Sequence, residues 1–317
     1  MPPRDRLLAL VVAVCWGLNF PATAIGLEHF PPLLMVALRF TLIAIPTVLL
    51  VPAPQVPLRW FLGMGIGMGT VQFALLYVAM AIGMPSGLAS LVLQSCAPFT
   101  VLLGAVFLRE RLDGRQVVGV VAAVIGLSVI AAHRATGGSA AALVPVLLTV
   151  GAGLGWAVGN ICSRQARAPR PLHLTLWMSV VPPVPLLALS LLLEGPQRDW
   201  QSVRTAFTLD ALPSVLGLLY IVVVASLVGY GLWNTLLSRN ASSVVAPFAM
   251  LVPIVGVLSS WLFFDEVPDL VELVAGVLVV GGVLYGSRTS RRRGGPPAPE
   301  RLRQDQGRSE PEHSLPA

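Results

Sequence analysis

Long apolar runs separated by short polar breaks dominate this chain. A helix that spans a membrane needs about 20 mostly apolar residues. The runs that meet this requirement cover residues 7–25, 33–51, 60–82, 86–108, 115–133, 143–162, 172–193, 213–236, 243–264 and 270–287. The pattern predicts an all-α integral membrane protein whose ten transmembrane helices are joined by short loops.

Composition agrees with this prediction. Of 317 residues, 55% are hydrophobic and only 11% are charged, and the mean hydropathy is +0.79, so polar surface is too scarce to solvate a soluble globule. The first run ends in Ala22-Thr23-Ala24, which leaves a cleaved signal peptide as the alternative to a first span. Residues 288–317 are rich in Pro, Gly, Arg and Glu, and we expect them to form a disordered cytoplasmic tail.

The basic residues, which are all arginines, orient the helices. In the ten-helix arrangement Arg39 alone lies inside a helix, and every other arginine except Arg134, Arg198 and Arg204 falls on the side of the N-terminus. Because positively charged loops stay in the cytoplasm, both termini are expected there, and the first run is expected to remain as a span. Arginines between apolar runs do not form a nucleic-acid face. We expect the Arg291-Arg292-Arg293 cluster to contact anionic lipid head groups.

The chain contains an internal repeat: a shift of 156 residues superimposes the third and fourth spans on the eighth and ninth, and the first and sixth spans also correspond. It divides the helical part into two halves of five helices, residues 7–133 and 143–287. Because five is odd, the second half must be inverted relative to the first, as is typical of secondary transporters. The matched positions include Tyr77 with Trp233, Gln94 with Met250, and Glu110 with Glu266.

Several short motifs together resemble a known family. They are Trp16-Gly17-Leu18-Asn19-Phe20, Arg39-Phe40, the stretch from Gln94 to Thr100, Phe107-Leu108-Arg109-Glu110-Arg111-Leu112 and Asp265-Glu266. Over residues 7–287 the chain is similar to EamA-type transporters of the drug/metabolite transporter superfamily, ten-helix carriers built from two EamA repeats. Ser86-Gly87-Leu88-Ala89-Ser90-Leu91 with Gln94 is most similar to the cysteine and O-acetylserine exporters.

The resemblance implies ATP-independent export of amino acids or related small metabolites through the bacterial inner membrane, without a cofactor. The chain departs from the repeat where Met250 takes the place of a second glutamine, and where Pro98 and Pro253 miss equivalence by one residue. Drugs, nucleosides or sugars remain alternative cargoes of the same fold, and proton coupling remains open. A non-transporting scaffold or sensor is a more distant alternative. The chain lacks the motifs expected of an intramembrane enzyme.

Polar and aromatic side chains at membrane depth are the candidate substrate-binding residues, because a buried polar group needs a partner or a cavity. We expect Asn19 and Asn160 to face one cavity, with a bond to a neighbouring helix as the alternative. Arg39 is placed to meet a substrate carboxylate, or else to pair with Glu28 or Asp265. The full set is Trp16, Asn19, Arg39, Gln72, Tyr77, Gln94, Trp156, Asn160, Tyr230, Trp233 and Asn234.

Two prolines are candidate hinges. Pro98 and Pro253 lie in equivalent helices, where each frees a backbone carbonyl that can line a cavity, although a passive kink is the alternative. The cysteines Cys15, Cys96 and Cys162 lie in apolar segments without metal-ligand spacing, so no metal site is expected.

Overall fold

The computed structural model describes residues 1–136 and 143–287. Within them, helices and connecting segments account for the whole fold, and ten helical stretches are long and apolar enough to cross a membrane. The predicted all-α membrane fold is therefore confirmed. The expected disordered tail, 288–317, lies outside the described residues.

The first half of the fold contains, in order, α1 (Pro3–Gly17), α2 (Asn19–Leu27), α3 (Pro32–Leu50), α4 (Leu58–Met64), η1 (Gly65–Val71), α5 (Gln72–Ala81), α6 (Ser86–Val92), η2 (Leu93–Ser95), α7 (Cys96–Phe107) and α8 (Gly114–Thr136). The second half contains α9 (Leu143–Ala166), α10 (Pro171–Trp177), η4 (Met178–Val180), α11 (Pro183–Leu193), α12 (Pro196–Thr205), α13 (Leu212–Leu219), η5 (Tyr220–Val228), α14 (Gly229–Arg239), α15 (Ser242–Ala249), α16 (Val252–Phe264) and α17 (Leu270–Ser287).

Interruptions within the spans fall at equivalent places in the two halves. The third and eighth spans contain the π-helical segments η1 and η5. Adding 156 to residues 65–71 gives 221–227, which lies inside η5. In the fourth span α6 and α7 meet at η2, and in the ninth α15 and α16 meet at Met250–Leu251; adding 156 to 93–95 gives 249–251. The two halves therefore share backbone irregularities as well as sequence, and such irregularities mark functional positions in membrane helices.

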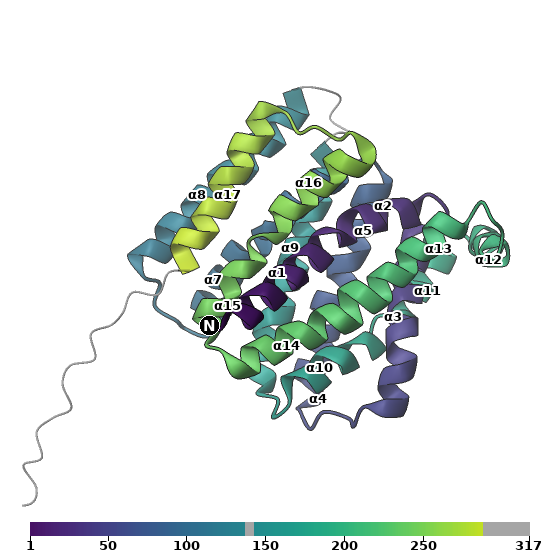
Figure 1. Cartoon of the computed structure of the whole chain (residues 1–317), viewed down its shortest axis with the longest axis horizontal. Coiled ribbons are helices and arrows are strands. Elements are labelled where there is room, and N and C mark those ends of the chain that lie inside the picture. Colours follow the sequence, from purple (N-terminus) through teal and green to yellow (C-terminus); the bar gives the residue numbers. More distant parts are fainter. Residues whose placement is uncertain (137–142, 288–317) are drawn as a thin grey trace, which may run out of the picture.

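The last helices of the two halves, α8 and α17, form a pair at one side of the bundle (Figure 1). Glycines allow their backbones to approach closely: a Cβ atom added to Gly282 would lie 2.8 Å from the Gly119 carbonyl oxygen. Such a contact of small residues is a usual way for membrane helices to associate. The pair thus joins the end of one repeat to the end of the other.

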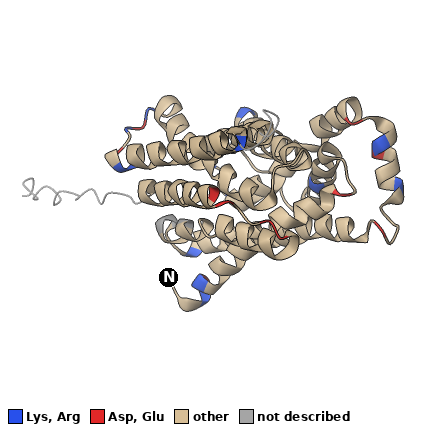
Figure 2. Cartoon of the chain, turned by 90° about the horizontal axis from the view of Figure 1, so that it is seen from above, with Lys and Arg blue, Asp and Glu red and all other residues tan. Residues whose placement is uncertain are grey.

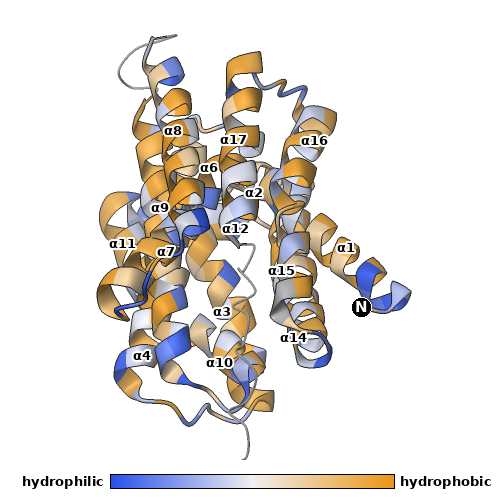
Figure 3. Ribbon diagram, turned by 90° about the vertical axis from the view of Figure 1, so that its left-hand side faces the viewer, coloured by the Kyte–Doolittle hydropathy of each residue, from blue (hydrophilic) through white to orange (hydrophobic). Residues whose placement is uncertain are grey.

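The outer surface is suited to lipid. Large apolar side chains such as Leu192, Leu262 and Val277 are exposed, and hydrophobic residues dominate the long helices (Figure 3). Charged residues lie mostly at helix ends and in connecting segments (Figure 2). We call the end of the bundle that carries Arg59, Arg109 and Arg164 the basic end, and the end that carries Glu194, Glu266 and Glu272 the acidic end.

The two ends of the bundle differ in packing. At the acidic end, α6 packs on α16 and α2 packs on α13. Towards the basic end, α7 packs on α9 and α8, whereas α15 packs on α1 and α14, so the fourth and ninth spans diverge beyond their breaks. A cavity of about 600 Å³ opens there between α7, α8 and α17. At the acidic end the structure also contains the short helix α12, which the pattern of apolar runs did not predict.

Candidate functional site

Arg39 is buried inside the protein, and its guanidinium group is hydrogen-bonded to neutral side chains. Its side chain is 4% exposed. One terminal nitrogen donates a hydrogen bond to the Tyr77 hydroxyl at 2.9 Å, and the other donates to the Ser226 hydroxyl at 3.1 Å. The guanidinium carbon is 4.1 Å from the centre of the Phe73 ring. Tyr77 belongs to the first half and Ser226 to the second, so Arg39 bridges the halves.

The structure does not pair Arg39 with Glu28 or Asp265 in this conformation. Within the described residues, Arg39 is absent from the ion pairs, and its Nε is buried without a hydrogen-bond partner. Glu28 is exposed just after α2, and Asp265 ends α16 in a left-handed conformation. A charged side chain at the centre of a membrane helix costs about 2.5–3.5 kcal/mol on insertion scales. This cation is therefore retained without an acidic partner in the described structure.

The helix that carries Arg39 is anchored from the other repeat. The backbone N–H groups of Leu33 and Leu34, in the first turn of α3, donate to the Glu194 carboxylate at 2.9 and 3.1 Å. The first N–H groups of a helix have no partner within the helix, and its N-terminus attracts negative charge. Glu194 follows α11, so the second half fixes the start of α3.

Three predicted aromatic residues come together beside this site. The Trp16 ring centre lies 5.6 Å from that of Tyr230 and 5.2 Å from that of Trp233. The indole N–H of Trp16 also donates to the Ala225 carbonyl oxygen in η5 at 2.9 Å. Tyr230 lines a small cavity together with Arg39 and Ser226. The aromatic cluster of Trp16, Tyr230 and Trp233 therefore adjoins the Arg39 site.

Gln94 lies where the fourth and ninth spans meet. Its amide nitrogen is 3.5 Å from the sulfur of Met250, its counterpart in the second half. A thioether accepts hydrogen bonds only weakly, so this amide keeps hydrogen-bonding capacity. The neighbouring Ser95 hydroxyl is buried without a partner, as are the side-chain carbonyl oxygens of Asn19 and Gln72. These breaks thus collect polar groups that are not satisfied in this conformation.

Other predicted residues have structural partners. Asn160 donates to Thr100 of α7 at 3.2 Å, which is the alternative of a bond to a neighbouring helix. Asn234 donates to the Tyr230 carbonyl oxygen at 2.8 Å within its own helix. Trp156 packs against the main hydrophobic core. These three side chains thus have partners within the protein.

The two prolines follow the breaks. Pro98 and Pro253 lie in the first turns of α7 and α16, where a missing N–H costs no helical hydrogen bond. Pro98 lines the cavity at the basic end. The Pro253 carbonyl oxygen accepts a hydrogen bond from Ser90 at 3.3 Å. Both residues thus begin a new helical segment, and their action as hinges remains a prediction.

A polar contact that the sequence did not reveal joins α6 to α16 at the acidic end. The Ser86 and Ser260 hydroxyls are 2.7 Å apart, and the Glu266 carboxylate accepts from Ser86 at 3.0 Å and from the Gly87 N–H at 3.3 Å. We call Ser86, Gly87, Ser260 and Glu266 the acidic-end contact. The repeat matches Glu266 with Glu110 and so draws attention to Glu266, but it does not identify Ser86, Gly87 and Ser260 as the partners of Glu266.

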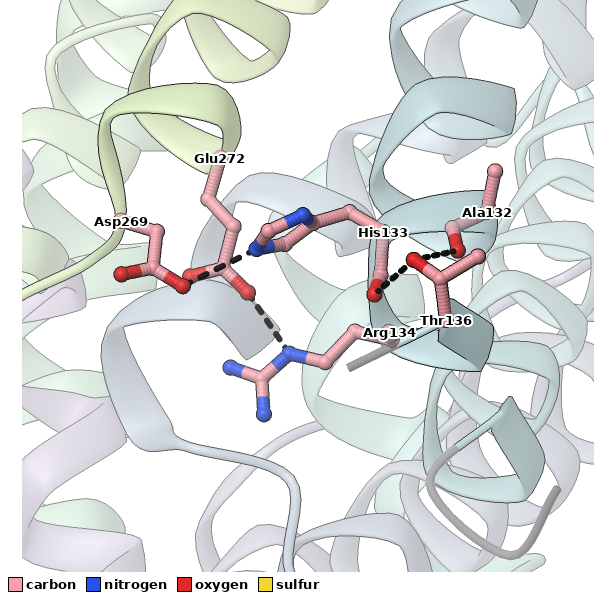
Figure 4. A network of polar contacts seen from close by, with 6 residues as sticks. All are labelled: Ala132, His133, Arg134, Thr136, Asp269 and Glu272. Carbon is pink, nitrogen blue, oxygen red and sulfur yellow. Dashed lines mark hydrogen bonds and ion pairs between the residues drawn. The ribbon is translucent and has the colours of Figure 1, made fainter. Parts of the chain in front are cut away.

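A second polar network joins α8 to the start of α17 (Figure 4). His133 lies 2.9 Å from Asp269, and Arg134 pairs with the buried Glu272 at 2.6 Å. At the basic end Arg164 pairs with Glu110 at 2.5 Å. Within residues 1–136 and 143–287, His, Cys, Asp and Glu form no group of three that could hold a metal ion. These three ion pairs join helices at the two ends of the bundle.

Comparisons with known proteins agree with this architecture. The model of the EamA-like transporter family matches residues 6–132 and 143–287. A protein of Salmonella typhimurium named "Probable amino-acid metabolite efflux pump" is 41% identical over 298 residues, which cover 92% of this chain and 98% of that protein. Its namesake in Escherichia coli K12 is 39% identical and covers 89% and 94%.

A more distant relative and a solved structure extend the comparison. A "Probable terminal-alkyne amino-acid exporter" of Streptantibioticus cattleyicolor is 25% identical over 297 residues, covering 90% of this chain and 94% of that protein. A crystal structure with 19% identity has a TM-score of 0.57 and covers 90% of this chain and 96% of its own, which supports the fold alone. With both halves matched by its family model, the chain belongs to the EamA-like transporter family.

Proposed function

We propose that this protein is a secondary, ATP-independent exporter of amino acids or related small metabolites in the bacterial inner membrane. The observation that carries the proposal is the difference between the two ends of one repeated structure. The fourth and ninth spans pack at the acidic end but diverge at the basic end, where a cavity between α7, α8 and α17 reaches Pro98. Inverted repeats that open alternately on either side are the basis of transport by such carriers.

The arginine distribution supports a cytoplasmic position for the basic end and for both termini. The cavity between α7, α8 and α17 then opens towards the cytoplasm. Exposed leucines on the outer helices face membrane lipids in this arrangement. The names of the relatives in Salmonella and Escherichia support amino acids or their derivatives as cargo.

We place the substrate between the halves, where the spans are interrupted. Arg39, Tyr77 and the aromatic cluster form one side of this region, and Gln94 with the unpaired groups of Asn19 and Gln72 forms the rest. Asn160, Asn234 and Trp156 support the surrounding helices. The region holds polar groups suited to a small zwitterion, so we assign it to substrate binding.

Release of metabolites from whole cells tests the proposal. Cells that produce the protein should release a narrow set of amino acids, and the Asn19→Ala, Gln94→Ala variant should lose this release at equal membrane abundance. Leu262→Ala, at a lipid-exposed position, is the matched control. Repeating the measurement with a dissipated proton gradient asks whether protons drive export. Equal release by the wild type, the double variant and cells without the protein would exclude amino-acid export.

A further inference from the structure

We infer that Arg39 binds the carboxylate of the transported molecule, an assignment that rests on the proposed export function. Both terminal nitrogens of Arg39 are held by neutral hydroxyls, those of Tyr77 and Ser226, and Nε is buried and unpaired. Neutral partners orient the guanidinium without neutralising it. A carboxylate that reaches this desolvated cation gains charge-assisted hydrogen bonds, and the planar guanidinium suits both carboxylate oxygens.

Within the described residues, the buried acidic side chains lie away from Arg39. The buried acidic residues of the described structure are Asp5, Asp199 and Glu272. Asp5 starts α1, Asp199 lies on α12, and Glu272 begins α17, so all three are near the ends of the bundle. Glu272 is already paired with Arg134. The ligand is therefore the natural source of negative charge for Arg39.

The position of Arg39 connects binding to motion of the halves. Its partner Tyr77 lies on α5 of the first half, and its partner Ser226 lies on the π-helical η5 of the second half. The cavity that Arg39 and Ser226 line has about 10 Å³ of free space, room for no more than one water molecule. A carboxylate must then replace one of these hydroxyls, and replacing Ser226 releases the direct bond between the halves at this point.

The aromatic cluster completes the recognition. Tyr230 lines the same cavity as Arg39, and the ring of Trp16 lies against the rings of Tyr230 and Trp233. Aromatic faces attract an ammonium group without contributing a competing charge. The site thus selects molecules with a free carboxylate, and amides or decarboxylated amines lack the group that Arg39 binds.

Uptake of substrates by proteoliposomes that contain the protein provides the test. Purified protein is given a mixture of the common amino acids and, separately, the matching α-amides, and uptake is measured by mass spectrometry. We expect the wild type to move amino acids but not amides. Arg39→Gln should lower amino-acid uptake about 30-fold or more, as for loss of one member of a buried charge pair, and should leave amide uptake equal to or above that of the wild type.

Two variants separate recognition from folding. Arg39→Lys retains the charge and should recover part of the amino-acid uptake, whereas Arg59→Gln removes an exposed arginine at the basic end and should behave as the wild type. Thermal midpoints in detergent show whether each variant is folded. If Arg39→Gln is unfolded, the preference of the wild type for amino acids over amides tests the assignment by itself. The assignment is overturned if a folded Arg39→Gln moves amino acids normally, or if the wild type moves amides equally well. A wild type that moves no amino acid contradicts the export function itself.

Discussion

At the scale of single residues, Glu194 shows how one half of the protein positions a side chain of the other. Its carboxylate accepts the N–H groups of Leu33 and Leu34, and thereby fixes the helix of Arg39. We expect Glu194→Ala to lower the free energy of unfolding by about 1–2 kcal/mol, the usual value of a helix cap. The thermal midpoint of the purified protein in detergent measures this effect. Glu28→Ala removes an exposed acid from the same end and should leave the midpoint unchanged.

The sequence predicted some residues of the candidate site but not their contacts. Arg39 stands out in the sequence because a lone cation in an apolar run is costly, and Trp16, Tyr230 and Trp233 do meet beside it. The partners of Arg39 were not predictable, since Ser226 reaches it only through the packing of η5. A short polar residue in an apolar run gives no signal that separates such a contact from a bond to its own helix.

At the scale of helices, the α8 and α17 pair depends on close backbone packing. A Cβ atom at Gly282 would crowd the Gly119 carbonyl oxygen and the Ala123 nitrogen, whereas one at Gly281 would meet nothing within 4 Å. Gly282→Ala should therefore destabilise the protein by about 1–3 kcal/mol through overpacking. Gly281→Ala, one position earlier, should be neutral or slightly stabilising. The thermal midpoint in detergent should therefore be lower for Gly282→Ala than for Gly281→Ala, and equal midpoints would contradict this packing.

Hydropathy located all ten spans but not their internal breaks. A π-helical or 3₁₀ segment contains the same apolar residues as an α-helix, so Gly65–Val71 and Leu93–Ser95 do not interrupt the apolar pattern. The repeat predicted equivalence between the halves, and the breaks at Met250–Leu251 and in η5 then follow the first-half breaks. The helix Pro196–Thr205 is short and mostly polar, so hydropathy does not predict it.

At the scale of the whole molecule, the acidic-end contact must open if the protein transports by alternating access. In the described conformation Ser86 and Glu266 close that end, while the cavity opens at the other. A Cβ atom at Gly87 would lie 3.2 Å from Cβ of Ser260, so a shift of a few tenths of an ångström gives the separation of about 3.5–4.5 Å found in disulfides. Cysteines at these two positions should therefore form a cross-link that holds the fourth and ninth spans together.

We predict that Gly87→Cys with Ser260→Cys, in a background where Cys15, Cys96 and Cys162 are replaced by alanine, loses export on oxidation. The loss should follow the cross-linked fraction and should be reversed by dithiothreitol, because release at the acidic end requires separation of α6 from α16. Each single cysteine variant, oxidised in parallel, should export as before. Substrate binding from the basic end should persist in the cross-linked protein, since the cavity there is unaffected. Undiminished export by fully cross-linked protein would mean that substrate leaves by another route, and the two repeats would then not act as alternating gates at this contact.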